Sequence, residues 1–69
     1  MTVNEKRREL IMITMFKRKI TKNKLAAVMN LSYPTVLSKI NNPASLKLQE
    51  CDTLCKTLKI NLIEFLTVK

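Results

Sequence analysis

The chain of 69 residues contains no glycine and only two prolines. A small all-β domain needs such residues at its tight turns, whereas helices tolerate their absence. Hydrophobic residues make up 46% of the chain, which is ordinary for a globular protein and excludes a disordered tail. The length suits one domain with a modest core. We therefore expect residues 1–69 to form a single all-α domain, a compact bundle of about five short helices.

The net charge of the chain is +8, and this charge is unevenly distributed along the sequence. No acid occurs between Leu10 and Gln49. The basic residues of this acid-free stretch are Lys17, Arg18, Lys19, Lys22, Lys24, Lys39 and Lys47. A field of one sign over part of a small domain attracts a polyanion, which favours a nucleic acid as partner over a merely soluble basic surface. With one tyrosine and two phenylalanines, the chain has too few aromatic rings for a platform that stacks single-stranded bases.

Hydrophobic periodicity and capping residues divide the chain into helices. The predicted helices are Asn4–Lys19, Lys22–Met29, Tyr33–Asn41, Leu48–Lys59 and Leu62–Thr67. The first is rich enough in β-branched residues that a strand is conceivable, but no hairpin turn lies near it. Besides its core face it carries an apolar stripe of Met12, Ile13 and Phe16. We expect this stripe to add to the core, with a protein interface as the alternative.

Two cysteines, Cys51 and Cys55, are spaced four residues apart, so that a helix places both on one face. A disulfide within one helical turn would be strained, and a structural zinc site needs four ligands, which a chain without histidine does not supply. We interpret the pair as small core residues in a reducing cytoplasm.

Sites of other kinds have little support in the sequence. There is no glycine-rich phosphate loop, no histidine and no clustered pair of carboxylates. The longest apolar stretch is too short to cross a membrane. We therefore expect a protein that is not an enzyme and that has no cofactor, metal, small-molecule ligand or membrane partner.

Residues 21–42 contain two short predicted helices separated by the turn Asn30-Leu31-Ser32. Asparagine tolerates the left-handed conformation that ends a helix, leucine can plug the core, and serine can cap the next helix. Pro34 lies in the first turn of that helix, where a missing N–H costs nothing. This order of residues predicts a helix-turn-helix motif, whose second helix enters the major groove of DNA.

Lys22 and Lys24 lie in the first turn of the first of these two helices. Cations there oppose the helix dipole, at a cost of roughly 0.3–1 kcal/mol each. A phosphate docked at this helix end would explain the cost, because it would bind the backbone N–H groups and the lysine charge together. Two solvated lysines at a tolerant surface site are the alternative.

The stretches ITKNKLAAVMNLSYPTVLSKINNP and LKLQECDTLCKTLKINLIEFL resemble the Cro and phage-repressor (XRE-type) helix-turn-helix family. The resemblance covers about Leu10 to Leu66. It implies a lambda-repressor-like domain that binds double-stranded operator DNA as a homodimer and acts as a transcriptional repressor of a phage or mobile element. The expected location is the cytoplasm of a bacterial cell or phage-infected host, at the nucleoid. The alternative is an interaction protein on the same scaffold, such as an antirepressor or an inhibitor of a host protein.

Carried over position by position, the resemblance assigns roles to individual residues. The residues expected to read bases are Tyr33, Pro34, Leu37 and Ser38. Those expected to bind DNA phosphates are Thr21, Lys22, Lys24, Thr35, Lys39 and Asn41. Those that match buried positions are Ala26, Leu31, Val36 and Ile40.

The chain also departs from the family pattern. The family usually has glycine where this chain has Asn30, and it often has Arg, Lys or Gln on the reading face, where this chain has Leu37 and Ser38. We therefore expect DNA shape to contribute more than usual to recognition. A role in the core or in binding a protein partner is the alternative for Tyr33 and Leu37.

The resemblance leaves the dimer interface open between two apolar patches. One is the stripe of Met12, Ile13 and Phe16. The other is the C-terminal group of Phe65, Leu66 and Val68, because small repressors of this kind commonly dimerise near that end.

Overall fold

The computed structural model describes residues 2–68 and is helical throughout its regular secondary structure in that range. Its elements are α1 (Val3–Arg18), α2 (Lys22–Met29), α3 (Tyr33–Asn41), the short 3-10 helix η1 (Pro43–Ser45), α4 (Leu48–Leu58) and α5 (Leu62–Leu66). The predicted all-α fold with five α-helices is confirmed. The bounds of α2 and α3 agree with the prediction, and η1 was not predicted.

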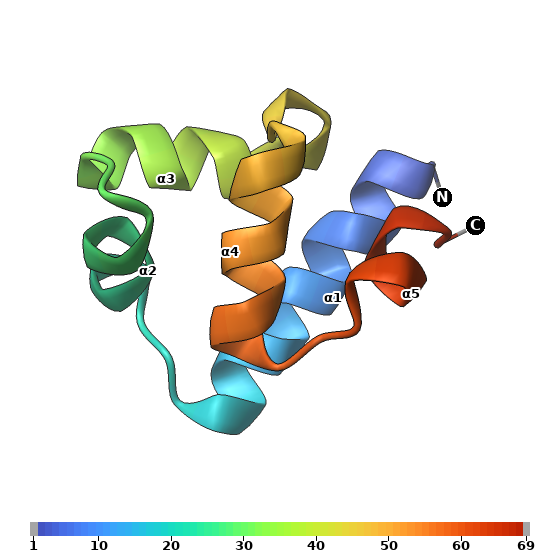
Figure 1. Cartoon of the computed structure of the whole chain (residues 1–69), viewed down its shortest axis with the longest axis horizontal. Coiled ribbons are helices and arrows are strands. Elements are labelled where there is room, and N and C mark those ends of the chain that lie inside the picture. The colour runs from blue at the N-terminus through green and yellow to red at the C-terminus, as the bar shows by residue number, and fades with distance from the viewer. Residues whose placement is uncertain (1, 69) are drawn as a thin grey trace.

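Helix α4 stands in the middle of the molecule (Figure 1). It packs against α2 on one side and against α1 and α5 on the other. Helix α3 lies at the edge of the molecule, where it packs against α2 and, through its C-terminal part, against η1 and α1. The inner side of the helix pair α2–α3 therefore packs against α4 and α1. The outer side of α3 is uncovered.

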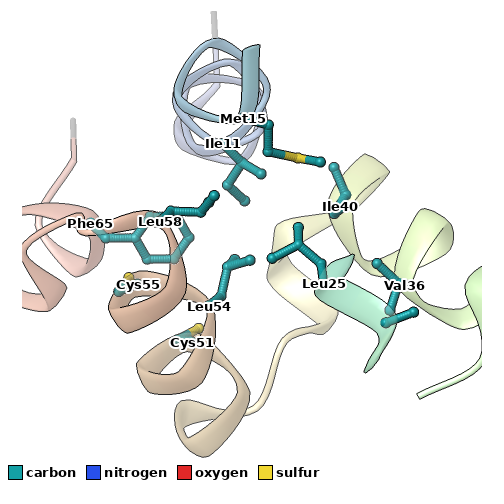
Figure 2. Packing of buried hydrophobic residues seen from close by; sticks show 11 residues of the cluster. Ile11, Met15, Leu25, Val36, Ile40, Cys51, Leu54, Cys55, Leu58 and Phe65 are labelled. Atoms are coloured by element: carbon teal, nitrogen blue, oxygen red, sulfur yellow. The ribbon is translucent and has the colours of Figure 1, made fainter. Parts of the chain in front are cut away.

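The core fills the space between all five α-helices (Figure 2). Its buried residues are Ile11, Met15, Leu25, Ala26, Val36, Ile40, Cys51, Leu54, Cys55, Leu58 and Phe65. The two cysteines are free thiols in this core, as predicted. Of the family's buried positions, Ala26, Val36 and Ile40 are buried, and Leu31 is partly buried and packs against the cluster.

The same three-residue linker joins three pairs of helices. Its first residue has a positive φ of 56 to 58°, its second is an apolar residue packed against the core, and its third caps the next helix. The three linkers are Lys19-Ile20-Thr21, Asn30-Leu31-Ser32 and Lys59-Ile60-Asn61. In each, the amide of the apolar residue donates to a carbonyl five residues earlier, at 2.9 to 3.0 Å. This bond closes the preceding helix and turns the apolar side chain inward.

The left-handed conformation of Asn30 is confirmed, whereas the predicted ends of three other helices are wrong by a residue. Lys19 and Lys59 were expected to be the last residues of their helices, but each adopts the left-handed conformation just past the end. Thr67 caps α5 from outside. At the other end of α1, Thr2 and Glu5 form a capping box, so that the helix begins at Val3.

The expectation that Met12, Ile13 and Phe16 add to the core is wrong. These side chains are 37%, 44% and 86% exposed. Helix α1 buries Ile11 and Met15 instead, and a helix on the surface buries only one face. The stripe points away from the core and forms an apolar patch on the surface.

The C-terminal patch is also different from the prediction, because Phe65 is fully buried. Arg7 of α1 holds α5 in place. Its guanidinium donates to the carbonyls of Phe65 at 3.2 Å and Leu66 at 2.7 Å. The same guanidinium lies 5.6 Å from the centre of the Phe65 ring. The exposed apolar side chains of α5 are Ile63 and Leu66.

Candidate nucleic-acid interface

The N-terminal ends of α2 and α3 are capped by side chains of the linkers before them. The Thr21 hydroxyl accepts the N–H of Lys24 at 3.1 Å, and the Ser32 hydroxyl accepts the N–H of Thr35 at 3.4 Å. The hydroxyls of Ser32 and Thr35 also lie 2.7 Å apart. Both helices therefore begin at defined residues. In α2 the remaining first-turn N–H groups are available to an anion. In α3 only Tyr33 can offer one, because Pro34 has no N–H and Thr35 donates to Ser32.

Helix α3 turns Val36 and Ile40 inward, with exposed fractions of 1% and 2%. Pro34, Ser38 and Asn41 lie on the opposite side, because spacings of four and three residues place them in one row. All three are exposed. This row is free to enter a groove of DNA.

Tyr33 and Leu37 border the outer row of α3 on one side, since they are four residues apart and next to it on the helix. Tyr33 is 44% exposed, so a core role is excluded for its side chain. Leu37 is half-buried and lies at the border between the row and the core. Of the four residues expected to read bases, three are thus exposed and Leu37 is partly covered.

Positive charge gathers at the N-terminal end of α2. Lys22 and Lys24 lie in its first turn, where there is no acidic residue. Lys24 is exposed and Lys22 is half-buried. Within residues 2–68 neither lysine has a carboxylate at ion-pairing distance. The charge at this helix end is therefore uncompensated by the protein itself.

Lys39 lies differently from the other predicted phosphate ligands. Its ammonium donates to Glu50 of α4 at 2.9 Å and to the carbonyl of Ser45 at 3.3 Å. The side chains of Lys39 and Glu50 are each only 18% exposed. This ion pair joins α3 to the start of α4. It also neutralises the charge of Lys39, which the sequence alone suggested was available to a phosphate.

The carboxylate of Glu50 also accepts the backbone N–H of Lys47, at 2.8 Å. This hydrogen bond, together with the Lys39 ammonium, lowers the pKa of Glu50 below its ordinary value and outweighs the opposing effect of desolvation. Glu50 is therefore charged at neutral pH and holds both the loop before α4 and the C-terminal half of α3.

Arg8 is a cation near α3 that sequence reasoning missed. It is exposed on α1, and its Nε donates to the side-chain oxygen of Asn41 at 3.4 Å. Asn4, one turn earlier, donates to Asn42 at 2.8 Å and accepts the N–H of Ala44 at 2.7 Å. The first turns of α1 thus lie against the C-terminal end of α3. No local sequence signal could indicate this contact, which joins residues 33 positions apart.

Cys51 and Cys55 are poorly suited to bind a metal or to act as nucleophiles. Burial raises the pKa of Cys55 to about 11 and raises that of Cys51 as well. Both are therefore protonated at neutral pH, and a protonated thiol is a poor nucleophile and metal ligand. Nor do three potential metal-binding side chains come together anywhere in residues 2–68.

A family described as the Cro/C1-type HTH DNA-binding domain matches residues 11–69. This range contains α2, α3, α4 and α5 and the second half of α1. No curated protein and no solved structure matches the chain significantly. Among the described helices none is both long and apolar enough to span a membrane.

Proposed function

The chain belongs to the Cro/C1-type helix-turn-helix DNA-binding domains, and on this premise we propose that it is a sequence-specific repressor of transcription. It binds double-stranded operator DNA as a homodimer on a palindrome and excludes RNA polymerase from the promoter, as a Cro-like regulator of a phage or another mobile element. The observations that carry this proposal are the uncovered, acid-free outer face of α3 and the uncompensated lysines in the first turn of α2.

In the proposed complex, α3 lies in the major groove. Ser38 and Tyr33 hydrogen-bond base edges, while Pro34 and the exposed part of Leu37 contact thymine methyl groups. Because α3 carries no arginine, lysine or glutamine on this row, each base contact is weak. Sequence-dependent shape of the duplex then supplies a larger share of the specificity.

Phosphates are bound at the helix ends. At the start of α2 they meet Lys22, Lys24 and the N–H groups of the first turn. Thr21 and Thr35, at the capped starts of α2 and α3, add hydroxyl contacts. At the C-terminal end of α3, Asn41 and Arg8 bind the DNA backbone together. Lys39 has a structural role in this proposal, because Glu50 already pairs with it.

The proposal separates residues that read sequence from residues that bind the backbone, and this separation can be tested. A specific duplex is first selected from a random DNA pool. Ser38→Ala should reduce the preference for this duplex over a random one by about 1 kcal/mol. Lys22→Ala and Arg8→Gln should weaken binding to both duplexes alike, and each should reduce the salt slope, d log K/d log[salt], by about 1.

Lys56→Ala is the matched control, because it removes the same charge from α4, where Asp52 pairs with the lysine at 3.0 Å. This variant should keep the slope of the parent protein. Equal effects of Ser38→Ala and Lys22→Ala on both duplexes would contradict the division of roles. Binding that hardly changes between about 50 and 200 mM salt would contradict DNA as the partner and support an apolar protein partner.

A further inference from the structure

We propose that the outer face of α1 is the dimer interface and that it binds the same face of a second copy, with the two helices antiparallel and a twofold axis passing beside Ile13. This inference rests on the proposed homodimer and names the surface that forms it. The surface consists of Glu9, Met12, Ile13, Phe16 and Lys17, which is called the α1 face below.

The α1 face is apolar in its middle and charged at its ends. Glu9, Ile13 and Lys17 follow one another at spacings of four residues, so they form one row along the helix. Phe16 lies beside this row and is 86% exposed, which is a large apolar surface to leave in water. No other helix of the described chain covers this row.

The charges of this row complement themselves when the helix is paired with an antiparallel copy. A twofold axis beside Ile13 places Glu9 of each copy opposite Lys17 of the other, which gives two ion pairs for one interface. Glu9 and Lys17 are both exposed, and within residues 2–68 neither is in an ion pair with its own chain. Each is thus available to a partner.

The exposed aromatic ring has apolar neighbours in this pairing. Phe16 and Met12 lie on the same side of the row, and the twofold axis keeps this side common to both copies. The antiparallel register brings Phe16 of one copy to the level of residue 10 of the other. The ring therefore packs beside Met12 and Ile13 of the second copy.

The α5 patch is a weaker candidate for the same role. Ile63 is 71% and Leu66 is 37% exposed. The only charge within α5 is Glu64, so this helix has no residue of opposite charge that could pair with it across a twofold axis. The α5 patch therefore lacks the charge complementarity of the α1 face.

The α1 pairing leaves the DNA-binding surface of each copy open. Asn4 and Arg8, the residues of α1 that contact α3, lie on the side of α1 opposite Ile13. The second copy therefore does not cover the outer row of α3.

The first test is cross-linking of the free protein, which needs no DNA. Ile13→Cys places a thiol next to its copy at the axis, so oxidation should give a disulfide-linked dimer at least about tenfold faster than the control Ile63→Cys on α5. The native Cys51 and Cys55 are buried and do not compete. Equal or faster cross-linking of Ile63→Cys would overturn the α1 face in favour of α5.

The second test reverses the charges and measures the dimer dissociation constant by sedimentation. Glu9→Lys and Lys17→Glu should each weaken the dimer about tenfold, because each creates two like-charge contacts. The double variant should restore it to within about threefold. A double variant as weak as the single ones, or a monomer at every concentration, would overturn the interface. Loss of DNA binding with cross-linking intact would instead contradict the proposed function.

Discussion

Lys39 shows how one neighbour can change the role of a cation. The fold brings Glu50 of α4 to 2.9 Å from its ammonium and Ser45 to 3.3 Å. Lys22 and Lys24 remain uncompensated at the start of α2. Because these lysines all lie in one acid-free stretch, their difference in role follows from tertiary contacts alone.

We expect the Lys39–Glu50 pair to make stability depend on pH. The pKa of Glu50 is lowered from 4.5 in the folded state, so its contribution is present at neutral pH and declines as the pH falls below about 4.5. Glu50→Gln should lower the free energy of unfolding at pH 7 by about 1–3 kcal/mol. The difference between parent and variant, measured by urea unfolding, should shrink toward pH 3.

Glu64→Gln is the control, since it removes an exposed carboxylate from α5. A difference between parent and Glu50→Gln that stays constant from pH 7 to pH 3 would show that the charge of Glu50 does not stabilise the fold.

At the scale of helices, the three linkers set where the bundle turns. Each one ends a helix on a residue with positive φ and buries the apolar residue after it. Only Asn30 among the three left-handed residues is of a type that tolerates this conformation well; the other two are lysines, which carry a Cβ that is strained there. Glycine in place of Lys19 or Lys59 should therefore stabilise the fold.

Lys59→Gly should stabilise the protein by about 0.5–1 kcal/mol, because glycine adopts a φ of 58° without steric cost. In a domain of this size such a change raises Tm by several degrees. Lys56→Gly, three residues earlier inside α4, should lower stability by about 1 kcal/mol. Thermal unfolding followed by circular dichroism measures both. Destabilisation by both substitutions would contradict the left-handed end of α4.

The helices that could be predicted accurately are those whose ends carry distinctive residues. Thr21, Ser32 and Asn30 mark α2 and the start of α3 so clearly that the predicted bounds agree with the structure. The ends at Lys19 and Lys59 could not be recognised, because lysine usually continues a helix.

Features of the site that depend on distant residues were beyond sequence reasoning. Hydrophobic periodicity showed two apolar faces on α1. It did not show that the core buries only one of them, the face that contains Ile11. The contact of Arg8 with Asn41 and the pairing of Lys39 with Glu50 join separate helices. The row of Pro34 and Ser38, in contrast, follows from helical spacing once the buried side of α3 is known.

At the scale of the whole molecule, the proposed DNA binding and the proposed dimerisation use different surfaces. In this proposal the outer row of α3 faces the duplex, and the α1 face joins the two copies. Helix α4 and the core between them fix one surface relative to the other. This arrangement requires that α3, and not α5, be the part of the chain that meets DNA.

The most direct test of this requirement is an NMR titration of the ¹⁵N-labelled protein with the selected duplex. We expect the amide signals of Lys22–Lys24 and Tyr33–Asn41 to shift most, those of Arg8 to shift with them, and those of Leu62–Leu66 to stay unchanged. Binding of the duplex with unshifted signals over Tyr33–Asn41 would show that α3 does not contact DNA.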